Sequence, residues 1–154
     1  YALTDAGREP WAAWAARGVR LAPSSPRLSA ADMAANASIL VPAGARGPTF
    51  VVFQNFHVIK KYNNATSYAM GVGTLGDRIA GGGGFQAPWP RDERELSRTE
   101  KIEMQQRLIA RGYDTGATDG VIGPNTTQAI RGFQVSQGMT PDGYATTALL
   151  LKLR

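Results

Sequence analysis

The chain has 154 residues, with 17 Lys and Arg, 12 Asp and Glu, one His and no Cys, which gives a formal net charge of +5. The absence of cysteine excludes disulfide bonds, thiolate nucleophiles and Cys-ligated metal sites. A single histidine excludes zinc sites that need two imidazoles. The 43% apolar and 19% charged residues are typical of a folded chain. Any catalysis is therefore expected from carboxylates, and we predict neither a metal nor another cofactor.

The excess of positive charge is spread thinly along the chain. The pI is about 9.9, but Lys60 and Lys61 are the only adjacent basic residues. A nucleic-acid site gathers its cations on one face or stripe, so we predict no nucleic-acid partner. An acidic polymer or an anionic cell-wall surface suits a weak positive field equally well, and the alternative is that the charge serves only solubility.

The first residue is Tyr and not Met, so we expect the chain to be processed or cut from a longer protein. No apolar run reaches the ~18 residues that a membrane span needs. We therefore expect no membrane anchor within this chain, and the sequence is compatible with an anchor in a segment upstream of it.

The first half of the chain predicts a short helix, a loop and a β-hairpin. An Ala-rich stretch favours a helix over 6–16. Residues 22–36 contain two prolines early in the stretch, Pro23 and Pro26, and predict a loop. β-branched and aromatic residues predict strands over 38–41 and 49–54. Pro and Gly between these strands indicate a turn, so we expect an antiparallel pair.

A second helix is predicted over 66–79, because its apolar residues recur at helical spacing. Asn63 or Asn64 is its expected N-cap. The residues of the apolar face are Tyr68, Val72, Leu75 and Ile79.

A linker is predicted over 81–96, between a first domain, 1–80, and a second domain, 97–154. A helix or strand over the four consecutive glycines at 81–84 would cost much conformational entropy. The prolines that follow prevent a helix from continuing. The second domain is at the small end of what folds without disulfide bonds or metals.

The second domain is predicted to be three helices, over about 97–111, 124–137 and 145–152. Ser97 and Glu100 have the spacing of a capping box at the first of these. The whole chain therefore predicts an α+β fold that is mostly α.

Two similar turns separate these helices. Asp119 and Asp142 each precede a glycine and are expected to fix their turns by accepting backbone N–H groups. Gly132 is an oddity, because glycine inside a helix costs about 1 kcal/mol against alanine.

Many spaced residues over about 98–154 agree at once with one known pattern. They are Gln105, Leu108, Gly112, Tyr113, Asp119, Gly120, Gly123, Thr126, Ala129, Ile130, Phe133, Gln134, Gly138, Pro141, Asp142 and Gly143. On these residues the segment resembles the peptidoglycan-binding module often attached to cell-wall enzymes. The resemblance implies a three-helix domain that binds peptidoglycan.

A second pattern covers about 10–80. Its most specific residues are Asn55, Phe56, Tyr62, Asn63, Tyr68 and Ala69. On these the segment resembles the C-terminal part of the catalytic domain of membrane-bound lytic murein transglycosylases of the B type. The resemblance implies part of a lysozyme-like fold. Enzymes of that family cleave the β-1,4 bond between N-acetylmuramic acid and N-acetylglucosamine without water, leaving a 1,6-anhydro end.

The resemblance also carries site residues. The family's catalytic acid–base is a Glu followed by Ser, and no Glu of this chain is followed by Ser. We therefore assign no catalytic residue here and expect that Glu upstream. The family's glycan-lining Tyr-Asn pair maps onto Tyr62 and Asn63, and Asn55 is expected to help shape the same groove. The alternatives are that Tyr62 packs in the core, Asn63 caps the next helix and Asn55 caps its own.

These observations together predict a bacterial peptidoglycan-binding chain of the periplasm or cell envelope, with glycan strands as its partner. The full-length parent is predicted to be a lytic transglycosylase, and the alternative is a non-catalytic wall-binding protein. We predict a monomer.

Overall fold

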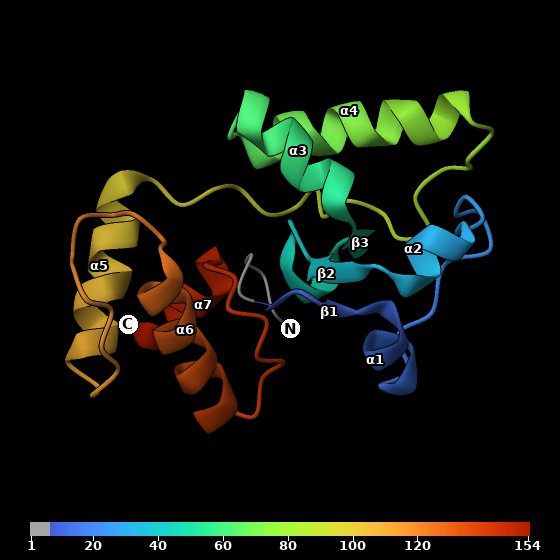
Figure 1. The fold of residues 1–154 in the computed structure, drawn as a ribbon. Helices are drawn as coiled ribbons and strands as arrows, with labels where there is room; N and C mark the ends of the chain where they lie inside the picture. The colour runs from blue at the N-terminus through green and yellow to red at the C-terminus, as the bar shows by residue number, and fades with distance from the viewer. Residues whose placement is uncertain (1–6) are drawn as a thin grey trace. The chain divides into compact units, whose positions relative to one another are not determined.

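The computed structural model describes residues 7–154 and divides the chain into two compact units. The first unit comprises Tyr1–Pro42 and Pro48–Pro88, and the second comprises Ala43–Gly47 and Trp89–Arg154. Their elements can be followed by colour in Figure 1. Among the described residues, no helix combines the length and the apolar character that crossing a membrane requires.

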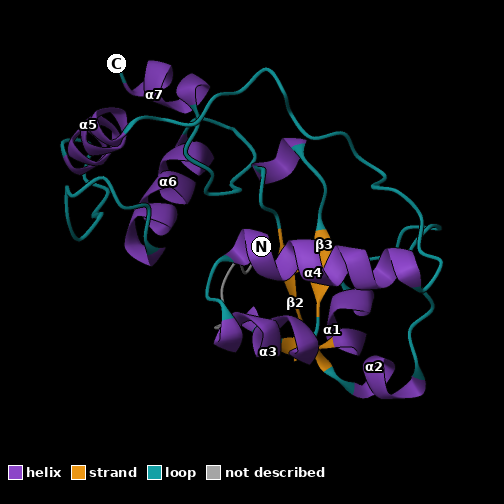
Figure 2. Cartoon of the chain, turned by 90° about the horizontal axis from the view of Figure 1, so that it is seen from above, coloured by secondary structure: helices purple, strands orange, loops and turns teal. Residues whose placement is uncertain are grey.

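The first unit contains a small antiparallel sheet in the order β1-β2-β3. The strands are β1 (Glu9–Pro10), β2 (Asn36–Leu40) and β3 (Phe50–Val52). Pairing of β2 with β3 confirms the predicted hairpin. Figures 1 and 2 show helix α4 on one side of this sheet and α1 on the other.

Helix α1 spans Trp11–Ala16. The predicted start at residue 6 lies outside the described residues, and the helical prediction for 9–10 is wrong. Those two residues form β1, where Pro10 pairs with Asn36. Trp14 is buried, and its indole N–H donates to the carbonyl of Ala37 at 2.9 Å.

Helix α2 (Ala30–Ala34) corrects the predicted loop over 22–36. Ser29 accepts a hydrogen bond from the backbone N–H of Asp32 at 3.1 Å, and the Asp32 carboxylate accepts from the N–H of Ser29 at 3.0 Å. This reciprocal cap satisfies two N–H groups that a helix start otherwise leaves unpaired. It allows five residues to form a helix in an otherwise irregular stretch.

Helices α3 (Gln54–Tyr62) and α4 (Thr66–Ile79) pack against each other. The predicted helix over 66–79 is confirmed, but its predicted cap is wrong. The N-cap is Ala65, which makes no side-chain cap, while Asn63 is the C-cap of α3. The Asn63 side-chain oxygen accepts from the N–H of Ala65 at 3.0 Å, which is the two-residue turn that asparagine favours.

The second unit contains α5 (Arg98–Ile109), α6 (Pro124–Ser136) and α7 (Thr147–Leu153), confirming the three predicted helices. The capping box of Ser97 and Glu100 is present. The core of the unit is built from Leu96, Met104, Leu108, Ala129, Ile130, Phe133, Leu149, Leu150 and Leu153.

Each of the two predicted turns is held by a buried glutamine on the preceding helix. Gln105 accepts from the N–H of Gly120 at 2.8 Å, and its amide also contacts Asp119. In the second turn, Gln134 accepts from the N–H of Gly143 at 2.8 Å, and its amide donates to the Asp142 carboxylate at 2.7 Å. We call these arrangements the two glutamine clamps.

Asp119 and Asp142 do what the sequence predicts. Asp119 accepts from the N–H of Val121 at 2.8 Å, and Asp142 from the N–H of Tyr144 at 2.9 Å. Burying a glutamine amide is costly unless its donors and acceptor are satisfied, so each clamp stabilises its turn and its helix together.

Candidate functional site

The residues predicted to contact glycan lie along helix α3 of the first unit. Asn55 is the second residue of α3 and Tyr62 is the last. A spacing of seven residues brings two side chains back to the same helix face about 10 Å apart. Val58 lies between them on that face and is 51% exposed. We call Asn55, Val58 and Tyr62 the α3 strip.

The α3 strip is open to solvent. Tyr62 is 85% exposed, so among the described residues it does not pack in the core. Its ring lies 6.2 Å from that of Tyr68 at an angle of 35°. Asn55 is exposed too and does not cap α3, because the N-cap is Phe53.

Asn63 follows the strip directly and is exposed. Its side-chain oxygen holds the turn to Ala65, and within residues 7–154 no hydrogen bond from its side-chain NH₂ group is found. An aromatic face beside amide donors and acceptors suits a sugar, which has apolar ring faces and polar substituents. Val58 was not predicted, although its three-residue spacing from Asn55 is the signal that places it there.

The described carboxylates of the first unit lie elsewhere in the sequence than α3. Glu9 pairs with Arg17. Asp32 has a lowered pKa because Ser29 donates side-chain and backbone hydrogen bonds to it. Asp77 is exposed near the end of α4, and its pKa is raised by partial desolvation. The remaining acidic residue, Asp5, lies outside the described part of the chain.

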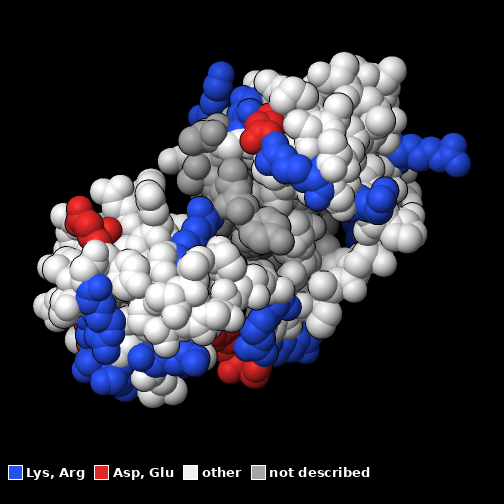
Figure 3. Space-filling model, turned by 90° about the horizontal axis from the view of Figure 1, so that it is seen from below, with Lys and Arg blue, Asp and Glu red and all other residues white. Residues whose placement is uncertain are grey.

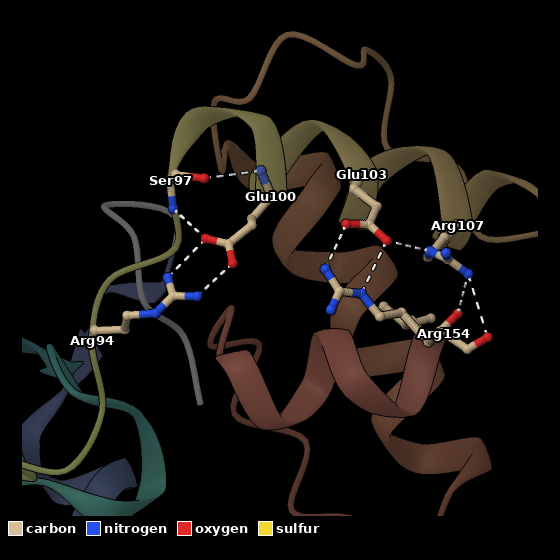
Figure 4. Close-up of polar contacts among 7 residues, drawn as sticks. Arg94, Ser97, Glu100, Glu103, Arg107 and Arg154 are labelled. Atoms are coloured by element: carbon tan, nitrogen blue, oxygen red, sulfur yellow. Dashed lines mark hydrogen bonds and ion pairs between the residues drawn. The ribbon is translucent and has the colours of Figure 1, made fainter.

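The acidic residues on α5 of the second unit are engaged in ion pairs (Figure 4). Arg94 makes two contacts of 2.5 and 2.8 Å with the Glu100 carboxylate. Together with the N–H of Ser97, this lowers the pKa of Glu100 to about 2. Glu103 binds Arg154 and Arg107, and these contacts lower its pKa as well.

This network joins the first helix of the unit to its last. Arg107 also donates to the carbonyl of Leu153 at 3.1 Å, so α5 is tied to the end of α7. These carboxylates therefore have structural partners. No group of three or more His, Asp or Glu suitable for a metal occurs among the described residues.

The basic residues form no single stripe on the face shown in Figure 3. Lys and Arg side chains lie there in several groups with neutral surface between them. This matches the scatter of basic residues in the sequence.

Comparison with known families places both units. Residues 1–77 match the family described as "Transglycosylase SLT domain". This chain belongs to that family. Residues 97–153 match the family described as "Putative peptidoglycan binding domain". Helix α3 and all but the last two residues of α4 lie within the SLT match. The resemblances inferred from the sequence are confirmed.

Two solved structures of SltB3 from Pseudomonas aeruginosa are similar to this chain. One is in complex with NAG-anhNAM-pentapeptide (46% identity) and the other with NAG-NAM-pentapeptide (47% identity). Each has a TM-score of 0.87 and covers 96% of this chain, which in turn spans 39% of the SltB3 chain. The likeness confirms the predicted fold class, mostly helical with a small sheet.

The spore cortex-lytic enzyme of Bacillus cereus is also similar, at 41% identity over 63 residues. The match covers 39% of this chain and 24% of the enzyme. The SLT-family chain thus spans only a part of the length of its relatives.

Proposed function

We propose that this chain is the glycan-holding part of a lytic transglycosylase joined to a peptidoglycan-binding module. The observation that carries the proposal is the likeness to SltB3, which extends over 96% of the chain and both of its units. Both SltB3 structures hold a peptidoglycan fragment. The partner of this chain is then peptidoglycan, and its place is the bacterial envelope, in the periplasm.

The reaction proposed for the full-length protein cleaves the MurNAc–GlcNAc β-1,4 bond. The muramyl C6 hydroxyl attacks the anomeric carbon, the bond to the leaving oxygen breaks, and a 1,6-anhydro end forms. One Glu protonates the leaving oxygen and takes the proton of the C6 hydroxyl, a general acid–base role. We place this Glu outside the 154 residues and assign Tyr62, Asn63 and Asn55 to holding the glycan.

We also propose that residues 1–80 and 97–154 work as separate domains joined by 81–96. In support, the two family matches end at residue 77 and begin at residue 97. The chain should be a monomer, which light scattering after size-exclusion chromatography measures directly.

Two experiments test the proposal. The purified chain should sediment with insoluble peptidoglycan but not with cellulose, and failure to sediment with the wall would contradict the binding function. Incubated with peptidoglycan, it should release no anhydromuramyl products detectable by mass spectrometry. Their appearance would show that a carboxylate of this chain acts as the acid.

For the glycan-holding residues, the probe is NAG-NAM-pentapeptide, added to the ¹⁵N-labelled chain. Amide signals of the α3 strip and Asn63 should shift, and Tyr62→Ala should weaken binding about tenfold through loss of ring stacking. Lys61→Ala, also exposed on α3, is the matched control. An equal effect of both variants would remove Tyr62 from the site.

The alternative is a non-catalytic wall-binding protein. It is favoured by one observation, that Glu9 and Asp32 are engaged in an ion pair and a helix cap. The protein encoded by the complete reading frame decides between the two. Anhydromuramyl products from that protein establish the enzyme, and wall binding without such products establishes the alternative.

A further inference from the structure

The second unit contains an open groove with a volume of about 470 Å³. One wall is formed by Gly112, Tyr113 and Asp114, which follow helix α5. The other is the outer face of α6, with Asn125, Gln128 and Gly132 among the lining residues. All of them lie within one compact unit.

The first wall is placed by the way α5 ends. Gly112 has φ +83°, a left-handed conformation that glycine adopts without strain. Its N–H donates to the carbonyl of Ile109, and the N–H of Tyr113 donates to that of Leu108, at 2.9 and 3.0 Å. This helix-ending motif turns the chain so that Tyr113 reaches α6.

Gly132 makes room for the tyrosine ring. A Cβ atom at this position would lie 3.0 Å from two ring carbons of Tyr113. The ring meets Phe133 edge-on at 6.0 Å between centroids. The helix glycine that is unexpected from the sequence is therefore the residue that lets an aromatic ring line the groove.

The second wall offers free amide groups. Asn125 and Gln128 are exposed and one helical turn apart on α6, and within residues 7–154 no hydrogen bond involves either side-chain amide. Asp114 uses one carboxylate oxygen to accept from the N–H of Gly116 at 2.8 Å. The groove thus presents an aromatic ring, two carboxamides and a carboxylate.

The charges of the groove select between the two components of peptidoglycan. Among the described residues that line the groove there is no Lys or Arg, and Asp114 carries the one carboxylate. A pentapeptide ends in a carboxylate, which would meet the Asp114 carboxylate with no Lys or Arg side chain among the described lining residues to compensate it. N-acetylglucosamine is neutral, and its acetamido group can pair with a carboxamide as both donor and acceptor.

We propose that this groove binds an N-acetylated sugar of the glycan strand, and not the stem peptide. The inference rests on the proposed peptidoglycan-binding function and identifies where, and through which chemistry, the second unit carries it out. Tyr113 supplies the stacking face, while Asn125 and Gln128 pair with the acetamido group.

The test uses the ¹⁵N-labelled full chain and the soluble tetramer of N-acetylglucosamine as probe. The tetramer should shift the amide signals of Tyr113, Asn125 and Gln128, whereas a free pentapeptide at the same concentration should not. The double variant Asn125→Ala/Gln128→Ala should weaken tetramer binding about tenfold. Gln106→Ala, an exposed carboxamide on α5, is the matched control and should leave binding unchanged.

Each outcome is decisive. The proposal is overturned if the pentapeptide shifts the groove signals and the tetramer does not, or if the tetramer shifts only the signals of other residues. It is also overturned if the double variant binds the tetramer as tightly as the unmodified chain. Sedimentation with insoluble peptidoglycan is measured in parallel. If the unmodified chain sediments but the tetramer leaves the groove signals unmoved, the site is wrong and the wall-binding function stands. If the unmodified chain does not sediment, that function itself has failed.

Discussion

The second unit buries the apolar faces of its helices, whereas the first unit leaves one of its own exposed. Leu108 and Ile130 are 0% exposed, on α5 and α6 respectively. On α4, Leu75 and Ile79 are 61% and 80% exposed within the described structure. Both units show the same helical periodicity in sequence. Periodicity therefore predicts a helix face whose burial stabilises the fold, but it does not predict which part of the protein buries that face.

The largest effect expected from this difference is on independent folding. Residues 89–154 expressed alone should unfold cooperatively, because their apolar core is complete without residues 43–47. That short segment is held by exposed polar bonds to Asp142 and Asp92, which contribute little to stability. Residues 7–88 alone should bind the dye ANS and aggregate through the face of α4. Calorimetry and ANS fluorescence measure both, and a sharp transition for 7–88 would remove the contrast.

A pair of leucine truncations sharpens the comparison. Leu108→Ala removes a fully buried side chain and should lower the free energy of unfolding of the second unit by about 2–5 kcal/mol. Leu75→Ala removes an exposed one and should change stability by less than about 0.5 kcal/mol. Urea denaturation of each variant gives these values, and equal losses would mean that α4 is covered in solution.

The glutamine clamps predict a smaller loss within the second unit. Gln105→Leu keeps the volume but leaves the N–H of Gly120 without its acceptor, which should cost about 1–3 kcal/mol. Gln106→Leu changes the neighbouring, exposed glutamine and is the matched control. Thermal unfolding followed by circular dichroism compares them. If both variants have the same melting temperature as the unmodified chain, the buried amide of Gln105 contributes nothing to stability.

The smallest expected effect is the pH dependence that comes from Glu100. Its pKa is lowered to about 2 from 4.5, so the folded second unit binds fewer protons here than the unfolded chain. The resulting stability is present above pH 4.5 and is lost as the pH falls towards 2. Glu100→Gln should therefore reduce the loss of melting temperature between pH 5 and pH 2. Because the Arg94 side chain is 62% exposed, high salt should also reduce this pH-dependent loss of stability. A pH profile unchanged by the substitution would contradict this origin.

Much of the fold follows from local sequence signals. The apolar spacing over 66–79 matches α4, and Ser97 with Glu100 marks the start of α5. Helix α2 was missed because its capping box uses Asp32 in the position where Glu or Gln is the usual signal. The short helix that this cap supports has no apolar periodicity to reveal it.

The sites were less accessible to prediction than the helices. Tyr62 and Asn63 came from resemblance, and their exposure depends on packing that no local pattern encodes. The groove depends on Tyr113 and Gly132, which are 19 positions apart and meet only when α6 folds against the end of α5. Gly132 is unfavourable for a helix when judged from the sequence alone, and a tertiary contact with Tyr113 accounts for its presence.

The two glutamine clamps differ in the length of chain that they close. Gln105 precedes Asp119 by 14 positions, and Gln134 precedes Asp142 by 8. The longer connection carries Gly112, Tyr113 and Asp114, the first wall of the groove. Scaffold and recognition are thus separable in this unit. A chimaera with the shorter connection in both places would keep the two glutamine clamps and lose that wall of the groove. Connections of other composition could be inserted between the same clamps to give the unit new ligands.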